Sequence, residues 1–247
     1  MTTDPPVAFA GWRGTVGVIR PSLRPGPLEE LIRLLPEGVG VIPLFLGIRE
    51  GTEAELRAAL GPCEEKVAEL AGAGVDLIHP EGTPMFMVHG FEGEERIVKA
   101  WEQRYGVPVV TAPQTQLEAM RALDMRSFVG VTYFSGEVNE IFRRYFEDAG
   151  FHVLDMEGMD VPFADVGRLS SYEIYAHAKR AYLRHPEAEG IYLLGSGWRV
   201  LNVPGLLEPD LGVPVVHAVA ARVWALQKRL HLRQPVVGYG RLLELFP

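Results

Sequence analysis

Cysteine is almost absent from this sequence of 247 residues, which contains only Cys63. One cysteine excludes a disulfide scaffold, which needs pairs, and argues against a structural zinc site, which usually needs several thiolates. No apolar run reaches the roughly 18 residues that cross a bilayer, so we expect no contact with a membrane. The N-terminus, MTTDPPVAFAGWRG, has no basic stretch followed by an apolar one. We therefore expect no signal peptide and a cytoplasmic protein.

Positive charge is also scarce. The chain has 24 lysines and arginines against 32 acidic residues, for a net charge of −8. A surface that neutralises phosphates is normally basic, so we expect no nucleic acid as a partner. The sequence contains neither a phosphate-binding P-loop nor a dinucleotide-binding glycine motif. No pair among the histidines has metal-ligand spacing, and His79-Pro80-Glu81 is too weak a signal to predict zinc.

Short apolar runs alternate with helical patterns along the first half of the chain. The apolar runs predict strands at 16–19, 39–46, 75–78 and 107–110. The spacing of apolar residues predicts helices at 28–35, 53–73 and 94–105. Continuous apolar runs separated by helices are typical of parallel strands that are covered on both faces. The pattern therefore predicts an α/β layered fold.

The same pattern occurs twice. The segment RGTVGV at 13–18 is matched by RSFVGV at 126–131, and GVPVV occurs at both 106–110 and 212–216. The segments 73–82 and 186–195 also share a pattern of apolar residues. This order predicts an α/β fold with two pseudo-symmetric, internally duplicated parallel-sheet halves and an active-site cleft between them. We place the halves at 1–112 and 113–230, with a tail at 231–247 that packs back on the N-terminal half.

Ligands of parallel α/β sheets bind beyond the carboxyl ends of the strands, where the loops gather. The duplication supplies four such loops in two related pairs, at 20–22 and 133–135 and at 81–84 and 195–198. A cleft between the halves would present two opposed faces to one small ligand. The candidate ligand-binding residues are therefore Arg20, Ser22, Gly82, Thr83, Pro84, Phe134, Ser135, Gly195, Gly197 and Trp198.

Several short motifs in and after these loops carry a family resemblance. They are Gly82-Thr83, Val138-Asn139-Glu140, Gly195-Ser196-Gly197, LGVPVV at 211–216 and GYGRL at 238–242. In this order and spacing they resemble the aspartate/glutamate racemase superfamily, in the branch of arylmalonate decarboxylase and maleate cis-trans isomerase. The resemblance covers nearly the whole chain.

The resemblance implies an enzyme without metal or cofactor that acts on a small carboxylate. In that family, backbone amides and hydroxyls of the strand-end loops hold the carboxylate and stabilise an enolate-like intermediate, as preorganised donors do for developing charge. One or two cysteines, one from each half, move the proton or attack the double bond. Homo-oligomers are common among soluble enzymes, and the sequence sets no number of subunits.

This chain departs from the family pattern at its reactive positions. The resemblance places the two cysteines at Gly82 and Gly195. Arylmalonate decarboxylase also has glycine at the first position but keeps the second cysteine. Cys63 lies in a helical pattern before a strand, where we expect a buried structural residue. Pro84 stands where the family often has serine, and it has no N–H to donate.

Three side chains are candidates to replace the thiols. Glu81 is either an acid or base in a semi-buried cleft, or a loop carboxylate bonded to backbone amides. Ser196 either donates a hydrogen bond or attacks as a nucleophile, or it belongs to an amide nest for an anion. Phe134 aligns with the family tyrosine. Tyr133, one residue earlier, supplies the missing hydroxyl only if the loop is remodelled, because neighbouring strand residues face opposite sides.

Other residues near the loops have two interpretations each. Arg20 and Arg199 either anchor the substrate carboxylate or make surface salt bridges. Trp198 is either an apolar wall for the substrate or part of the core. His79 and His217 lie near strand ends, and we interpret them as structural.

The preferred function is decarboxylation of a malonate-like acid, because loss of CO2 forms a carbanion without a thiol base. Two alternatives remain. One is a racemase-like or maleate isomerase-like isomerase that uses a mechanism without cysteine. The other is a carboxylate-binding protein that has kept the fold and lost the reaction.

Overall fold

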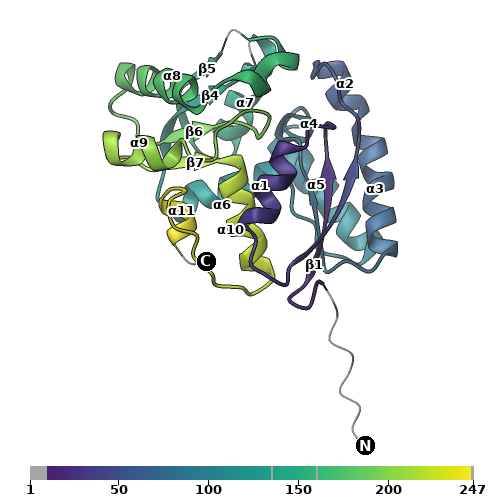
Figure 1. The fold of residues 1–247 in the computed structure, drawn as a ribbon. Coiled ribbons are helices and arrows are strands. Elements are labelled where there is room, and N and C mark those ends of the chain that lie inside the picture. Colours follow the sequence, from purple (N-terminus) through teal and green to yellow (C-terminus); the bar gives the residue numbers. More distant parts are fainter. Residues whose placement is uncertain (1–9, 135, 160, 246–247) are drawn as a thin grey trace, which may run out of the picture.

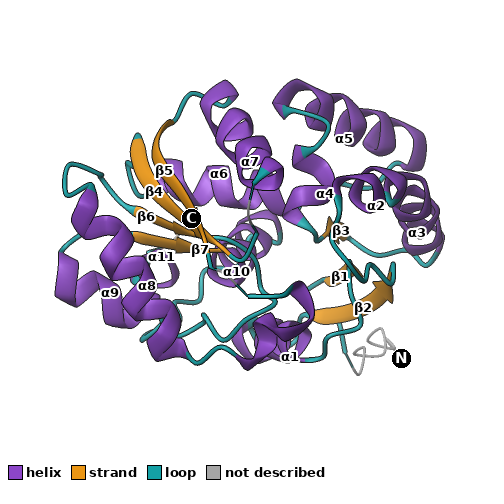
Figure 2. Ribbon diagram, turned by 90° about the horizontal axis from the view of Figure 1, so that it is seen from above, coloured by secondary structure: helices purple, strands orange, loops and turns teal. Residues whose placement is uncertain are grey.

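A computed structural model describes residues 10–134, 136–159 and 161–245. Within that part of the chain the strands form two parallel sheets, with the orders β2-β1-β3 and β5-β4-β6-β7. Figure 1 shows the two sheets in separate lobes, and Figure 2 shows helices α4, α6, α7 and α10 between them. The strands are β1 (Thr15–Arg20), β2 (Gly40–Phe45), β3 (Leu77–Pro80), β4 (Ser127–Thr132), β5 (His152–Gly158), β6 (Ile191–Leu193) and β7 (Val215–His217).

Helices connect the strands and cover the sheets. In the first half of the chain they are α1 (Gly26–Leu34), α2 (Glu53–Ala58), α3 (Leu60–Gly72), α4 (Thr83–Met87), α5 (Phe91–Tyr105) and α6 (Ala112–Ala122). In the second they are α7 (Glu137–Asp148), the 3-10 helix η1 (Phe163–Arg168), α8 (Ser171–Arg184), α9 (Pro204–Leu211), α10 (Ala218–Arg229) and α11 (Arg241–Glu244). Helices α8 and α9 contact one face of the second sheet, and α6 and α7 contact the other (Figure 2).

The duplicated α/β fold that the sequence predicts is confirmed. Strands β1 and β4 occupy equivalent places, each between the next strand in sequence and a later one. The first sheet uses residues 15–80 and the second uses residues 127–217. Continuous apolar runs form these strands because both faces of each sheet are covered.

Two predicted elements differ from the structure. The run at 107–110 makes only an isolated bridge between Ile78 and Val109, whereas its counterpart forms strand β7. Thr111 caps helix α6 directly after the run. The predicted helix at 53–73 is divided into α2 and α3 at Ala59. Pro62 in the first turn of α3 has no N–H to continue the hydrogen bonds of α2.

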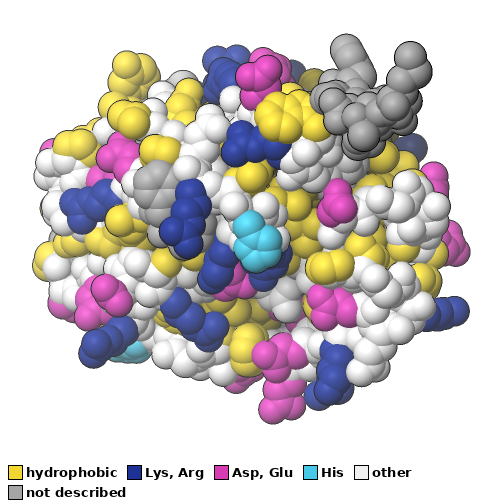
Figure 3. Space-filling view, turned by 90° about the horizontal axis from the view of Figure 1, so that it is seen from below, with side chains coloured by type: hydrophobic (Ala, Val, Ile, Leu, Met, Phe, Trp, Pro, Cys, Tyr) yellow, Lys and Arg dark blue, Asp and Glu magenta, His cyan; other side chains and the backbone are white. Residues whose placement is uncertain are grey.

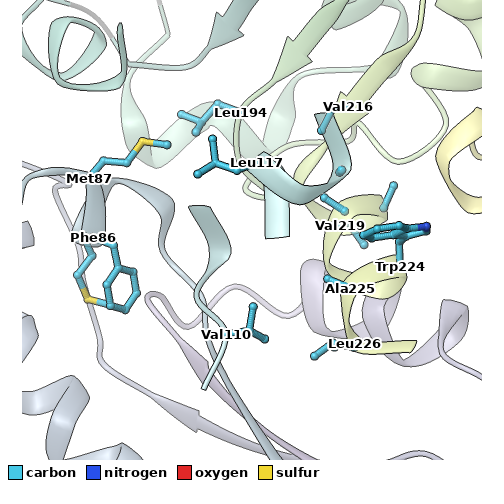
Figure 4. Close-up of a cluster of buried hydrophobic side chains, with 14 of the residues drawn as sticks. Phe86, Met87, Val110, Leu117, Leu194, Val216, Val219, Trp224, Ala225 and Leu226 are labelled. Carbon is cyan, nitrogen blue, oxygen red and sulfur yellow. The ribbon is translucent and has the colours of Figure 1, made fainter. Parts of the chain in front are cut away.

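A continuous core joins the two lobes. Figure 4 shows Phe86 and Met87 of α4 in the same cluster as Val216 of β7 and Trp224 of α10. Helix α10 packs on α6 and α1, so the second half contributes a helix to the centre of the molecule. A second cluster lies under α8 and α9. Burial of this apolar surface holds the halves together.

The C-terminal segment lies against α10 and the end of α9. The backbone N–H of Arg241 donates to Glu208 Oε2 at 2.7 Å, and helix α11 contacts α10. One long contact, from Arg13 Nη1 to Gln234 Oε1 at 3.5 Å, reaches the N-terminal half. None of the helices among the described residues is long and apolar enough to cross a bilayer. On the face shown in Figure 3, basic, acidic and apolar side chains are interspersed.

The lobes also meet at a buried carboxyl group. Glu94 on α5 is 0% exposed and accepts hydrogen bonds from the hydroxyls of Thr111, at the start of α6, and Tyr145, on α7 of the second half. Burial raises the pKa of Glu94 from 4.5 to about 7, and the two hydrogen bonds oppose that rise. The carboxyl group therefore holds its proton in the folded protein at pH values where the unfolded chain has released it.

Because the pKa of Glu94 differs between the folded protein and the unfolded chain, the free energy of unfolding depends on pH. Between pH 4.5 and 7 the unfolded chain binds fewer protons at Glu94 than the folded protein, so its contribution to the free energy of unfolding falls as pH rises. Each pKa unit corresponds to about 1.4 kcal/mol. The variant Glu94→Gln cannot titrate, so we expect its stability relative to the wild type to increase from pH 5 to pH 8. Urea denaturation across this range tests this, and parallel pH profiles for the two proteins would contradict it.

Candidate functional site

A small cavity lies where the strand-end loops of both halves meet the start of α10. Its volume is about 60 Å³, and its wall includes residues of β1, of the loops after β3, β4 and β6, and of α10. The first half contributes Gly82, Thr83 and Pro84, and the second contributes Gly195, Ser196 and Gly197. The cavity therefore lies between the halves, at the carboxyl ends of the parallel strands, as ligand sites of α/β folds do.

One wall of the cavity carries a buried group of three charges. The guanidinium Nη1 of Arg20, at the end of β1, lies 3.0 Å from Glu81 Oε2, and Nη1 of Arg222, on α10, lies 2.6 Å from Glu81 Oε1. The three residues are 1–2% exposed, and the two arginines line the cavity while Glu81 does not. Burial lowers the pKa of Arg222, and the charge of Glu81 opposes that change. The group has a net charge of +1 and favours an anion in the cavity.

The hydroxyl of Tyr133 lies beside the glycine loop of the second half. A Cβ atom built on Gly195 would lie 2.5 Å from Tyr133 Oη and 2.8–2.9 Å from carbon atoms of its ring. The phenol therefore occupies the space that a side chain at position 195 would need. Gly195 also has a φ of +77°, which favours glycine. Burial raises the pKa of Tyr133, while the charge of Arg24 and the amide of Gly197 oppose that rise. The phenol keeps its proton at neutral pH.

A remodelled loop brings Tyr133 to the cavity. Strand β4 ends at Thr132, whose hydroxyl contacts both the backbone N–H and the carbonyl oxygen of Phe134 at 3.0 Å. Asn139 Nδ2 also donates to the Phe134 carbonyl at 2.9 Å. Because the chain turns here, strand alternation no longer applies, and Tyr133 and Phe134 both line the cavity.

A buried chain of polar groups orients Thr83. Gln116 Nε2, on α6, donates to Thr83 Oγ1 at 2.8 Å, and the hydroxyl of Tyr192, on β6, donates to Gln116 Oε1 at 2.6 Å. All three residues are at most 4% exposed. Because Thr83 Oγ1 accepts from Gln116, its own hydrogen is left to donate toward the cavity.

The cavity lining also includes apolar side chains, among them Ile48, Leu56, Phe134 and Phe163. Arg24 Nη2 of the first half donates to the carbonyl oxygen of Phe163 in the second half at 2.5 Å. The same guanidinium lies 4.4 Å from the centre of the Phe163 ring, in cation–π geometry. The two halves are thus joined by a contact between two residues that line the cavity.

Histidines near the site have structural hydrogen bonds, as the sequence interpretation expects. His217 Nε2 donates to the carbonyl oxygen of Gly195 at 3.0 Å, and His79 Nδ1 donates to that of Val110 at 2.7 Å. Burial lowers the pKa of His217 to about 3 and that of His79 well below 6.5, so both rings are neutral. His217 therefore fixes the glycine loop. Among the described residues, no group of histidine, cysteine or acidic side chains could hold a metal ion.

Cys63 is a buried helix residue, as the sequence predicts. It lies on α3 with 0% exposure, and burial raises the pKa of its thiol to about 12. A thiol of this kind is a poor nucleophile. We expect Cys63→Ala to keep turnover within about twofold of the wild type, and we expect the folded protein to resist iodoacetamide. Rapid alkylation accompanied by loss of turnover would contradict this expectation.

Most residues that the sequence predicts for the site lie around the cavity. They are Arg20, Ser22, Gly82, Thr83, Pro84, Tyr133, Phe134, Gly195, Ser196 and Gly197. Ser135 lies outside the described residues. Trp198 does not line the cavity, because its ring is buried in the second core, 5.2 Å edge-to-face from Tyr133. Glu81 lies behind the two arginines, and Arg199 is exposed.

Several residues of the site escaped the sequence reasoning, above all Arg222. One signal for it was available, since Arg222 is the only Lys, Arg, Asp or Glu between residues 211 and 227. A lone charge in an apolar helix is expensive to bury unless it is paired. Arg24, Phe163 and Gln116 carry no comparable signal, because their roles depend on contacts between the halves.

The fold and the cavity define a class of protein, a duplicated α/β protein with a small arginine-lined cavity between its halves. Comparison with known proteins gives the family. The family model for arylmalonate decarboxylase matches residues 17–243. This chain therefore belongs to the arylmalonate decarboxylase family.

The similar proteins are enzymes. Arylmalonate decarboxylase of Bordetella bronchiseptica is 24% identical over 236 residues, 93% of this chain and 96% of that protein. Maleate isomerase of Nocardia farcinica is 25% identical over 244 residues, 93% and 95% of the two chains. Both comparisons place this chain among enzymes of the decarboxylase and isomerase kinds.

Solved structures share the fold. A maleate cis-trans isomerase of Nocardia farcinica with a covalently bound succinylcysteine intermediate superposes with a TM-score of 0.86, 23% identity and coverage of 94% of this chain and 98% of that one. A mutant of arylmalonate decarboxylase in the liganded form superposes with a TM-score of 0.85, 22% identity and coverage of 93% of this chain and 98% of that one.

Proposed function

We propose that this protein is a cofactor-independent decarboxylase of a small malonate-like acid, with Tyr133 as the proton donor. The observation that carries the proposal is the place of the Tyr133 hydroxyl, 2.5 Å from where a Cβ of residue 195 would be. The family resemblance puts a reactive thiol at that position. A protonated phenol in the same space supplies a proton where the thiol is missing.

The cavity has the two environments that decarboxylation needs. Hydroxyl donors of Thr83 and Tyr133 and the arginines Arg20 and Arg222 favour negative charge on the retained carboxylate. The apolar side chains of Leu56 and Phe163 give the departing carboxylate little solvation, which favours its loss as neutral CO2.

The reaction balances without an added reagent. The bond between the α-carbon and one carboxylate breaks, and its electron pair moves into the enolate of the retained carboxylate as CO2 leaves. The Tyr133 hydroxyl then gives its proton to the α-carbon. The resulting phenolate is stabilised by the charge of Arg24 and the amide of Gly197 until a solvent proton replaces the one transferred.

Because the cavity is small while Arg24 contacts Phe163, we expect malonates with short alkyl substituents to be better substrates than arylmalonates. The test is CO2 release from a series of alkyl- and arylmalonates, with maleate as a separate substrate. We expect CO2 from at least one small malonate and no conversion of maleate to fumarate. Conversion of maleate without CO2 release would instead support an isomerase, and ligand-induced thermal stabilisation without turnover would support a binding protein.

A further inference from the structure

We propose that Arg20 and Arg222 form a binding site for one carboxylate of the ligand, and that Glu81 is its positioning residue and not a proton donor. The proposal deepens the proposed function and rests on it only for the identity of the cavity as the substrate site. It assigns a role to Arg222 and replaces the catalytic role that the sequence suggested for Glu81.

The charge balance of the cavity wall carries the first step. Arg20, Glu81 and Arg222 are each nearly inaccessible to solvent and together have a net charge of +1. Burying a charge without a partner is costly, so the group is complete only when an anion joins it. Glu30 on α1 also interacts with both arginines, but its strongest charge interaction is with Arg33, and it lies outside salt-bridge distance of Arg20 and Arg222.

Unused hydrogen-bond donors carry the second step. Nε of Arg20 and Nε of Arg222 are buried without a hydrogen-bond partner among the described residues. Nη1 of Arg222 is close to Glu81 but lacks hydrogen-bond geometry. A guanidinium has five N–H donors in a planar fork that matches a carboxylate. Glu81 Oε2 also lacks a hydrogen-bond partner in the described part of the chain, but two guanidinium groups have about ten N–H donors, more than one carboxylate accepts.

The position of Glu81 carries the third step. It follows β3 directly, and its backbone N–H donates to the Ile19 carbonyl at 2.8 Å, which fixes it beside the end of β1. Its carboxylate contacts one arginine from each half and does not reach the cavity. It can therefore fix the positions of the two guanidinium groups beside a ligand, but it cannot contact the ligand's α-carbon.

Calorimetric titration of malonate and of its neutral analogue malonamide tests the proposal on the full-length protein. The preference for malonate is the ratio of the two affinities. We expect a preference of at least about tenfold in the wild type, the size of a charge-assisted hydrogen bond. Arg222→Met makes the wall neutral, and we expect it to lose most of this preference. Arg143→Met, on α7 and outside the cavity lining, is the control and should leave the preference for malonate unchanged.

Variants of Glu81 change the net charge of the wall in the opposite direction and make the test sharper. Glu81→Gln raises the net charge of the wall to +2 and should increase the preference for malonate, with turnover reduced but retained because the two guanidinium groups are no longer held together. The double variant Glu81→Gln with Arg222→Met returns the wall to +1 and should bind malonate more tightly than Arg222→Met alone. If Glu81→Gln does not fold, as judged by circular dichroism, the single Arg222→Met and the double variant decide the matter.

Two results would overturn the proposal. One is an Arg222→Met variant that folds and keeps the full preference for malonate. The other is a Glu81→Gln variant that binds malonate as the wild type does and has lost turnover, which would make Glu81 a catalytic acid or base. A wild type that prefers malonate but releases no CO2 from any malonate would end the proposed function and leave this proposal standing.

Discussion

Tyr133→Phe is expected to slow CO2 release from a malonate by about 10²–10³-fold, the range for losing a positioned proton donor or oxyanion donor. The substitution removes only the hydroxyl. The ring keeps its contacts with Phe134, at 4.8 Å, and with Trp198, at 5.2 Å between centroids. The anion site formed by Arg20 and Arg222 is untouched, so malonate should bind with an affinity close to that of the wild type.

The measurement is kcat and KM for CO2 release, with malonate affinity determined separately by calorimetry. Tyr172→Phe is the matched control, because Tyr172 is 76% exposed on α8, away from the cavity. A Tyr133→Phe variant with an unchanged kcat would show that another group or water delivers the proton. A variant that loses affinity and keeps its kcat would make Tyr133 a binding residue only.

Gly195→Cys, which would restore the thiol of the family, is expected to destabilise the protein by about 2–5 kcal/mol. About 1–2 kcal/mol comes from a side chain at positive φ, and about 1–3 kcal/mol comes from overpacking against the Tyr133 ring. The variant should gain no activity, because the sulfur and the phenol cannot share the space. Thermal and urea denaturation measure the stability change.

Two further variants separate these contributions. Gly212→Cys carries a similar φ of +79° but has no atom within 4 Å of its Cβ, so it should show the backbone cost alone. In the double variant Gly195→Cys with Tyr133→Ala, the ring is gone and the overpacking cost should disappear. A Gly195→Cys protein no less stable than Gly212→Cys would show that Tyr133 does not fill this space.

The fold and the four loops around the cavity could be predicted from the sequence for one physical reason. Strands buried on both faces appear as continuous apolar runs, and each ends where a loop meets the ligand. Two copies of the same order therefore predicted that Gly82 and Gly195 meet at one site, and both line the same cavity.

What the sequence did not predict depends on contacts between distant segments. The alternation rule predicted that Tyr133 faces away from the position of Phe134, but the strand ends at Thr132 and both residues line the cavity. Glu81 was interpreted as an acid or base, or as a carboxylate bonded to backbone amides, because its partner Arg222 lies 141 positions later in the numbering. Trp198 is two residues beyond Ser196, yet the turn between them sends its ring into the second core.

A structure of the protein with malonate bound tests the central claim most directly. We predict that the anion lies between the two glycine loops, with one carboxylate on Arg20 and Arg222. The Tyr133 hydroxyl should lie within about 3.5 Å of the ligand's α-carbon or of a carboxylate oxygen. A malonate bound outside this cavity, or one inside it that contacts neither the arginine pair nor Tyr133, would contradict the account.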